Sequence, residues 1–264
     1  MADLEYSVAD GIATLLLNRP EKKNAFSDEM LKRWRECLVE AQGDENVRVI
    51  VVTGAGDAFS SGGDLGRRTN EAASAPPTVL QRKQRLANGT HRVALTMQEI
   101  DKPVIAAVNG AAVGAGMDMA LMCDIRVAAR SARFSEGYIR VGLVPGNGGC
   151  YFLPRVVGTA QALELLWTAD FLNAEQAEKI GLVNHVYDDA TFRDDVHAFA
   201  SRIAAAPPVN VRAIKRTVYQ SLTTDLRTSL ELISSHMAIV QTTEDYREAI
   251  NAYKEKRSGK YRGR

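Results

Sequence analysis

Residues 104–124 read VIAAVNGAAVGAGMDMALMCD, and the order of residue types in this stretch decides the fold class. An apolar run, 104–108, ends at an Asn-Gly pair and is followed by a glycine-rich turn. Small and apolar residues then surround a single acid, Asp118. A buried strand, a glycine turn and a buried helix are typical of α/β proteins. We therefore expect a strand at 104–108 and a helix over 111–122.

The same stretch is long and apolar enough to raise the question of a membrane span. However, it contains Asn109, Asp118 and several glycines, and an unpaired acid is costly in lipid. The N-terminal segment MADLEYSVADG carries acids where a signal peptide carries basic and then apolar residues. We expect a soluble, cytoplasmic protein.

Composition narrows the function classes. Apolar residues make up 45% and charged residues 25% of 264 residues, and the net charge is +1. Such a charge offers no global field for nucleic acid or an anionic membrane. The three cysteines, Cys37, Cys123 and Cys150, have neither disulfide-framework nor zinc-site spacing, which is typical of a reducing compartment. His91, His185, His197 and His236 are scattered, without metal spacing.

Local signals place the elements around the opening stretch. Asp10-Gly11 predicts a hairpin within 5–18, and Ser27 is a helix cap before an apolar stripe that Gly43 can end. The remaining expectations are a strand in VRVIVVTGAG (47–56), a surface loop at 69–78, a helix over 80–100, and a strand at 125–129 with a helix after it. Alternation of strands and helices favours an α/β core over 1–200, and 201–264 reads as a helical region.

Two glycine loops follow buried strands. The first is GDAFSSGGDL (56–65), and the second contains Gly110, Gly114 and Gly116. Ligands collect at the carboxyl ends of strands in open α/β sheets, and free amides at a helix start stabilise a negative oxygen. We expect the two loops to aim one amide each at the same oxygen, although an ordinary strand-to-helix turn explains either loop alone.

Other interpretations of these residues stay open. GAGMDMA (114–120) is a relaxed dinucleotide fingerprint, with Glu136 about twenty residues later, and would suit an NAD(P)-dependent oxidoreductase. Arg82, Lys83, Arg85 and Arg92 make one helix basic, which a solvated face explains more simply than RNA binding or a scaffolding role. No serine-hydrolase elbow or Walker A motif is present.

A third segment, FSEGYIRVGLVPGNGG (134–149), carries Glu136 and Tyr138 before a tight turn that opens a helix. Both side chains can exchange protons, and Glu136 can equally be a helix-capping or salt-bridging acid. If the segment is extended the two share a face, and if it is helical they diverge.

Several segments together resemble the crotonase superfamily, the enoyl-CoA hydratase/isomerase family. The likeness is carried by NRPEKKNAFS (18–27), AFSSGGDL (58–65), residues 102–129, residues 134–149, LPRVVG (153–158) and YREAINAYKEKR (246–257). It implies a spiral of β-β-α turns as the core, C-terminal helices that build a trimer or a dimer of trimers, and a coenzyme A thioester as substrate. It implies no separate cofactor and no metal, since coenzyme A is part of the substrate.

By position in these motifs, the resemblance assigns the oxyanion-hole amides to Gly63 and Ala115. Thioester chemistry at carbon passes through an enolate, and two fixed amides stabilise its oxygen by on the order of 3 kcal/mol each. The coenzyme A contacts that it implies are Lys22, Lys23, Ala25, Ser61, Gly62, Asp64 and Leu65, with Lys254 or Lys256 reaching a phosphate, in this or a neighbouring subunit.

The chain departs from the family pattern at the acids. Hydratases of the family usually have two glutamates, and here Asp118 and Tyr138 stand in those places, with Glu136 two residues earlier. Some isomerases of the family place an aspartate in the later turn, which here holds Gly146 and Asn147. Asp118 with Glu136 would hydrate a 2-enoyl-CoA by syn addition of water. Asp118 as sole acid and base would isomerise an enoyl- or dienoyl-CoA. Hydration, the commoner activity of the family, is the first expectation.

Overall fold

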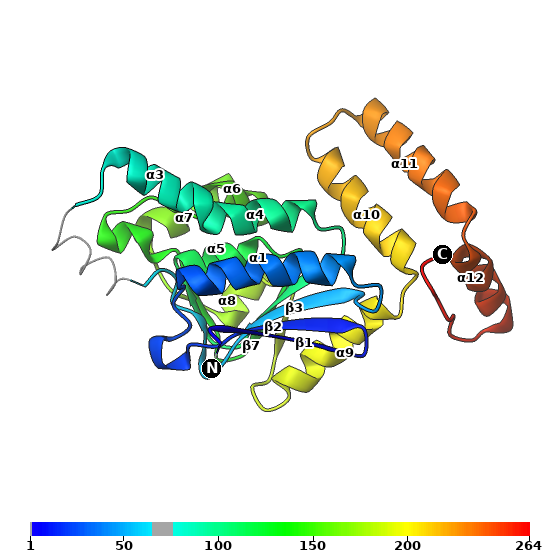
Figure 1. Ribbon diagram of the computed structural model, residues 1–264, viewed down its shortest axis with the longest axis horizontal. Coiled ribbons are helices and arrows are strands. Elements are labelled where there is room, and N and C mark those ends of the chain that lie inside the picture. Colours follow the sequence, from blue (N-terminus) through cyan, green and yellow to red (C-terminus); the bar gives the residue numbers. More distant parts are fainter. Residues whose placement is uncertain (1, 65–75) are drawn as a thin grey trace.

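The computed structural model describes residues 2–64 and 76–264, which form a mixed α/β fold with two sheets and a set of C-terminal helices (Figure 1). The larger sheet has the order β1–β2–β3–β5–β7–β10, with bounds Leu4–Ala9, Ile12–Leu17, Val49–Gly54, Val104–Val108, Ile125–Ala129 and His185–Tyr187. The smaller sheet has the order β4–β6–β8–β9, with bounds Ala58–Ser60, Ala111–Val113, Arg133–Ser135 and Leu172–Asn173.

The two sheets grow together from a repeated β-β-α unit. A strand of the larger sheet is followed within a few residues by one of the smaller sheet, as in β3 and β4, β5 and β6, and β7 and β8. Consecutive strands of the same sheet then pair in parallel, β3 with β5 and β4 with β6. Each unit ends in helices that return the chain, which gives the spiral that the family resemblance implies.

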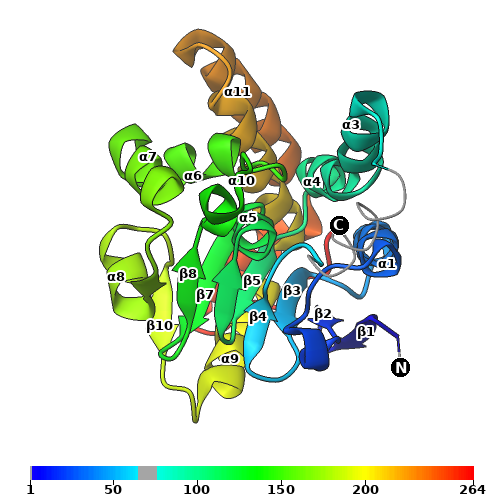
Figure 2. The same ribbon diagram turned by 90° about the vertical axis from the view of Figure 1, so that its left-hand side faces the viewer.

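The helices have the following bounds: α1 Asp28–Gly43, α3 Val79–Asn88, α4 Thr90–Glu99, α5 Ala115–Leu121, α6 Gly149–Val157, α7 Thr159–Thr168, α8 Ala174–Lys179, α9 Phe192–Ala204, α10 Pro208–Ser221, α11 Leu226–Gln241 and α12 Glu244–Glu255. Two 3-10 helices, η1 and η2, cover Pro20–Lys22 and Gly137–Val141. Figure 2 shows α5 over the ends of the strands, between α4 on one side and α6 on the other.

Strong local signals gave the right elements. The hairpin turn has Asp10 at φ 52° and Gly11 at φ 77°, the left-handed conformations of a two-residue hairpin. The hydroxyl of Ser27 accepts a hydrogen bond from the Met30 amide and so caps α1, which ends at Gly43 as expected. The strands at 104–108 and 125–129 are also confirmed.

Three expectations about helices were wrong. Residues 111–113 begin no helix but form β6, because they pair with β4 and β8 in the smaller sheet. The single helix expected over 80–100 is broken at Gly89, which separates α3 from α4. After β7 the chain enters β8 and η2, and the next α-helix starts only at Gly149. The loop expected at 69–78 lies largely outside the described residues.

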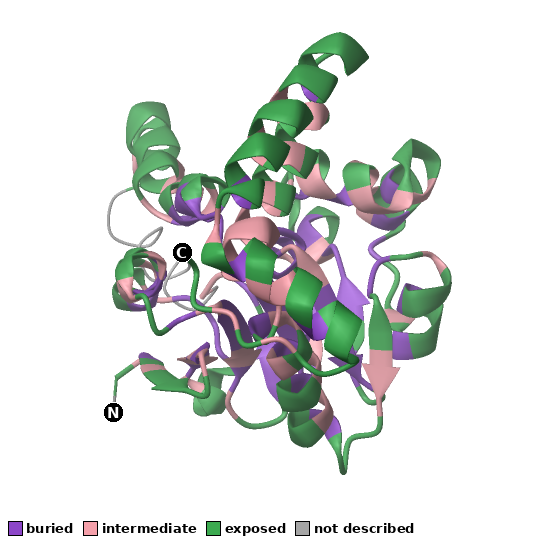
Figure 3. Ribbon diagram, turned by 90° about the vertical axis from the view of Figure 1, so that its right-hand side faces the viewer, coloured by how far each residue is buried: buried purple, intermediate pink, exposed green. Residues whose placement is uncertain are grey.

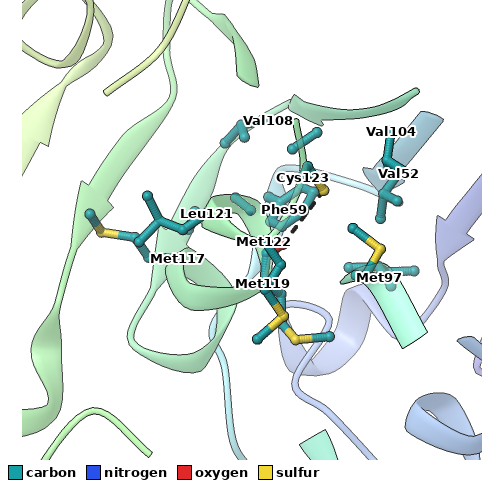
Figure 4. Packing of buried hydrophobic residues seen from close by; sticks show 14 of the residues in the cluster. Val52, Phe59, Met97, Val104, Val108, Met117, Met119, Leu121, Met122 and Cys123 are labelled. Atoms are coloured by element: carbon teal, nitrogen blue, oxygen red, sulfur yellow. Dashed lines mark hydrogen bonds between the residues drawn. The ribbon is translucent and has the colours of Figure 1, made fainter. Parts of the chain in front are cut away.

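The core is a large apolar cluster around α5. Figure 4 shows Met117 and Leu121 on one side of this helix and Met119 and Cys123 on the other, with Phe59 close by. Every residue of α5 is buried. A helix that is buried all round needs protein on every side, so Asp118 on this helix is enclosed by the core.

The C-terminal helices extend away from the sheets (Figure 1). Helix α10 is fixed to the core by polar contacts, in which Lys215 donates to Asp124 over 2.7 Å and Arg212 donates to Asp101 over 2.7 Å. Most of α11 is exposed (Figure 3). No helix in the described parts of the chain is long and apolar enough to cross a membrane.

Candidate active site

The acid singled out by the sequence lies at the centre of the fold. Asp118 is in the first turn of α5 and is fully buried. Its Oδ2 accepts a hydrogen bond of 2.5 Å from the phenol oxygen of Tyr138. Tyr138 belongs to η2, the 3-10 helix that follows β8. Two segments twenty residues apart in the chain therefore meet at one carboxylate.

Glu136 is the second acid of the site. It precedes η2 and is 1% exposed. A Cβ added at Gly149 would collide with Oδ1 of Asp118 and would lie 3.1 Å from Oε1 of Glu136, so both carboxyl groups converge on the space that Gly149 leaves free. When both acids are ionised, Oδ1 of Asp118 and both oxygens of Glu136 have no hydrogen-bond partner among the described residues. A proton held between the two acids supplies the missing donor.

The electrostatics of the pair follow from burial. Burial raises the pKa of Asp118 to about 6, although hydrogen bonds from Tyr138 and Glu136 act to lower it. Burial and then the charge of Asp118 raise the pKa of Glu136 to about 10. Burial and the same charge raise the pKa of Tyr138, so the phenol keeps its proton. Near neutral pH the pair carries one proton, held mainly on Glu136.

Two further side chains extend this network. The amide Nδ2 of Asn147 donates to the phenol oxygen of Tyr138 over 2.9 Å. The hydroxyl of Thr90, the first residue of α4, donates in turn to Oδ1 of Asn147. Both residues are buried, and sequence reasoning missed them as site residues. Asn147 was visible only as a turn residue, and Thr90 carried no signal inside an apparently continuous helix.

The two glycine loops lie against each other beside α5. Gly62 has φ 86°, and a Cβ there would lie 2.7 Å from the carbonyl oxygen of Val113 and 2.9 Å from the amide nitrogen of Ala115. Only glycine permits this approach. The amides of Gly63 and Ala115 form no hydrogen bond with any other described residue. Two unpartnered amides thus come from adjacent loops, one of them at the start of α5.

Most residues expected to contact coenzyme A lie on two adjacent segments, 22–26 and 61–64. Ser61 donates from its amide to the carbonyl of Lys23 over 2.8 Å, which aligns 61–64 with 22–26. Lys22 pairs with Asp64 over 3.2 Å, and Lys23 pairs with Asp57 over 2.6 Å. Ala25 and Gly62 are buried in the same region. Leu65 lies outside the described residues.

The expected phosphate-binding lysines lie elsewhere in the chain. Lys254 is in the last turn of α12, and Lys256 follows this helix. Figure 1 places α12 at the opposite end of the molecule from the start of α1, next to which Lys22 and Lys23 lie. Within one chain these two lysine pairs do not come together.

The remaining expectations concern metal, dinucleotide and RNA sites. No group of His, Cys, Asp or Glu side chains within 2–64 and 76–264 could hold a metal ion. Glu136, which the dinucleotide interpretation needs for a ribose, is instead buried against Asp118. Arg82, Lys83 and Arg85 on α3 and Arg92 on α4 are all exposed, as a solvated basic face would be.

Comparisons with known proteins identify the family to which the chain belongs. The sequence profile described as enoyl-CoA hydratase/isomerase matches residues 7–264. The chain belongs to the enoyl-CoA hydratase/isomerase family. A relative from Escherichia coli K12, named 1,2-epoxyphenylacetyl-CoA isomerase, is 38% identical over 97% of both chains. A crotonyl-CoA hydratase from Syntrophomonas wolfei is 33% identical over 95% of this chain and 94% of its own.

Solved structures of enoyl-CoA hydratases have the same fold. The enoyl-CoA hydratase from Bacillus anthracis superposes with a TM-score of 0.92 at 31% identity, and the match covers 99% of this chain and 100% of the other. The crotonase fold and the membership of an enzyme family are therefore established for this chain. An acyl-CoA substrate fits the family.

Proposed function

We propose that this member of the enoyl-CoA hydratase/isomerase family is a hydratase, which adds water to the C2=C3 double bond of a 2-enoyl-CoA. The observation that carries the proposal is the pair of buried carboxyl groups of Asp118 and Glu136, with different pKa values. Such a pair is a base and an acid at the same pH. Hydration needs both, because one proton leaves water while another arrives at carbon.

The residues divide the reaction as follows. Asp118 accepts a proton from water as the water oxygen bonds to C3, and the double-bond electrons move to the thioester carbonyl. The resulting enolate takes the proton of Glu136 at C2, on the same face. The proton on Asp118 then returns to Glu136, which restores the starting state. Water and the enoyl group are consumed, and no cofactor is required.

The amides of Gly63 and Ala115 are the proposed partners of the enolate oxygen. Two facts support this assignment. Neither amide has another partner among the described residues, and the Ala115 amide lies at the positive end of α5. Two such donors stabilise the enolate by on the order of 3 kcal/mol each. Donors that act mainly on the charged intermediate lower the barrier rather than tighten substrate binding.

The coenzyme A moiety is proposed to lie along 22–25 and 61–65. Exposed Lys22 and Lys23 supply cations for its phosphates. Lys254 or Lys256 would come from a neighbouring subunit, since α12 is distant within one chain. Exposed apolar side chains on α10, on α11 and at Leu222 between them support a homo-oligomer, a trimer or a dimer of trimers. They are Ile214, Val218, Leu222, Leu226, Leu230, Ile233 and Met237.

Double-bond isomerisation is the second candidate. It is favoured by the 38% identity to a protein named 1,2-epoxyphenylacetyl-CoA isomerase. It requires only that one base remove a proton from carbon and return it to another carbon. Asp118 alone could do so. The need for Glu136 therefore distinguishes the two candidate reactions, because hydration requires it and isomerisation does not.

The test uses crotonyl-CoA and a 3-enoyl-CoA, with the conjugated-thioester absorbance as signal. For a hydratase we expect loss of signal with crotonyl-CoA, and a fall in kcat/KM of about 10²- to 10⁴-fold for both Asp118→Asn and Glu136→Gln. Glu164→Gln, an exposed acid on α7, is the matched control and should match wild type. A gain of signal with the 3-enoyl-CoA that survives Glu136→Gln, without turnover of crotonyl-CoA, would replace hydration by isomerisation.

A further inference from the structure

Four buried side chains connect α4 to the acid pair. In order from the helix they are Thr90, Asn147, Tyr138 and Asp118, exposed by 8%, 5%, 8% and 0%. Each donates to the next or accepts from it, through the hydrogen bonds already described. Buried networks with every member satisfied fix side-chain orientation.

We propose that Thr90 and Asn147 are positioning residues, which hold the phenol of Tyr138 as a donor to Asp118 and thereby assign to Asp118 the role of base. Neither residue needs to touch the substrate. The catalytic consequence rests on the proposed function, whereas the orientation of the phenol does not.

The donor and acceptor roles in this series of hydrogen bonds are fixed from its two ends. An ionised Asp118 can only accept, so Tyr138 donates to it. The phenol oxygen is then left as an acceptor, and Asn147 presents its NH₂ to it. This leaves Oδ1 of Asn147 facing α4, where the hydroxyl of Thr90 supplies a proton. Without that donor, Asn147 can turn its oxygen toward the phenol and draw the phenol proton away from Asp118.

A second contact holds the start of α4 against the 145–148 turn. The ring Nε2 of His91 lies 2.8 Å from the carbonyl oxygen of Gly146, next to Asn147. The break at Gly89 starts α4 afresh at Thr90, so that its hydroxyl points to the turn rather than along a continuous helix. Thr90 is therefore connected to the acid pair through the 145–148 turn, which carries Asn147.

Within 2–64 and 76–264, few other titratable groups face the acid pair. Glu136 and Tyr138 lie against Asp118, and both acids act on the thiol of Cys150 at the start of α6, which together with burial raises its pKa. His91 lies on the far side of the turn. A change at Thr90 therefore reaches Asp118 through Asn147 and Tyr138, and no cation of the described residues lies beside Asp118 to mask it.

The test compares Thr90→Val with Thr90→Ser, and uses Thr96→Val as the matched control. Thr96 is on the same helix and is also 8% exposed, and it takes no part in the hydrogen bonds that join Thr90, Asn147, Tyr138 and Asp118 in the described structure. Infrared titration, with bands assigned by Asp118→Asn and Glu136→Gln, reads both acids without any substrate. We expect Thr90→Val to raise the pKa of Asp118 by about one unit, because the ionised carboxylate loses the hydrogen bond from Tyr138. Thr90→Ser and Thr96→Val should leave it in place.

A second variant guards against misfolding of the first. Asn147→Leu removes the donor that makes the Tyr138 hydroxyl a stronger donor, so it should raise the pKa of Asp118 in the same direction. Both variants should lower kcat/KM about tenfold at pH 5 and only about twofold at neutral pH, because the ionised fraction of Asp118 falls by these factors. An unshifted titration in Thr90→Val or Asn147→Leu would overturn the proposal, as would an equal shift in Thr90→Ser or Thr96→Val. A shifted pKa of Asp118 in a protein that turns over no enoyl-CoA would support the positioning role of Thr90 and Asn147 and would reject hydration as the function.

Discussion

Two buried aspartates of this chain have opposite surroundings. Asp101, 3% exposed, receives hydrogen bonds from Gln42 and Arg212 and pairs with Arg216. Burial acts to raise its pKa, but these partners outweigh burial and hold the pKa below its usual value. Asp118 has no cation beside it in the described structure and faces a second acid and a phenol. Its pKa is raised.

The difference separates a structural acid from a chemical one. A carboxylate whose lone pairs are filled by arginines has a fixed charge and little left to offer a substrate. A carboxyl group buried against another acid exchanges its proton near neutral pH. Burial alone is common to both sites. The identity of the neighbours decides which of the two joins α10 to the core and which can move a proton.

The largest expected effect comes from exchanging each aspartate for asparagine. Asp118→Asn should lower kcat/KM for crotonyl-CoA by about 10³-fold or more, because the base is lost while the fold keeps its shape. Asp101→Asn should leave kcat of the folded enzyme close to wild type. It should lower the free energy of unfolding by about 1 kcal/mol, since Arg212 and Arg216 are partly exposed and can regain water. Steady-state kinetics and denaturant unfolding measure the two effects.

The comparison would fail if the two phenotypes were exchanged. Loss of turnover in Asp101→Asn, measured on folded protein, would mean that the arginine-bound acid takes part in the chemistry. Normal turnover in Asp118→Asn would remove Asp118 from it.

The buried proton on Glu136 should make the stability of the protein depend on pH. The folded protein keeps a proton on Glu136 up to about pH 10, whereas the unfolded chain loses it near the ordinary value of 4.5. Between these values the folded state binds more protons, so its stability falls as pH rises. Glu136→Gln removes this dependence, so its stability relative to the wild type should rise by roughly 4 kcal/mol between pH 5 and pH 8, at about 1.4 kcal/mol per pH unit. Thermal unfolding of both proteins at the two pH values measures it, and a variant whose relative stability is the same at both would contradict it.

The parts of the fold that the sequence predicted are those with local signals. Asp10-Gly11, Ser27 and the runs at 104–108 and 125–129 each carry their own turn, cap or strand chemistry. Residues 111–113 carry none, because Ala-Ala-Val is too short for a period and its strand exists only through pairing with β4 and β8. The break at Gly89 falls at Asn88-Gly89, a pair typical of turns, but the helical periodicity of the flanking residues outweighed it in the prediction.

The same distinction holds at the site. Asp118 stood out in the sequence because it is the only charged residue between Val104 and Cys123. The orientation of Glu136 and Tyr138 did not follow from the sequence, since the segment is neither extended nor α-helical but turns into a 3-10 helix between them. Thr90 and Asn147 are brought to the acids by the meeting of α4 with the 145–148 turn, a contact across 57 residues.

The central claim is that Asp118 and Glu136 share one proton and use it on an enoyl-CoA. The most direct test is the pH dependence of kcat/KM for crotonyl-CoA. We expect a bell, because turnover needs Asp118 ionised, above about pH 6, and Glu136 protonated, below about pH 10. Asp118→Asn should abolish turnover, and Glu136→Gln should abolish the alkaline limb of whatever turnover remains. A profile that is flat from pH 5 to pH 11, or an alkaline limb unchanged in Glu136→Gln, would contradict the account.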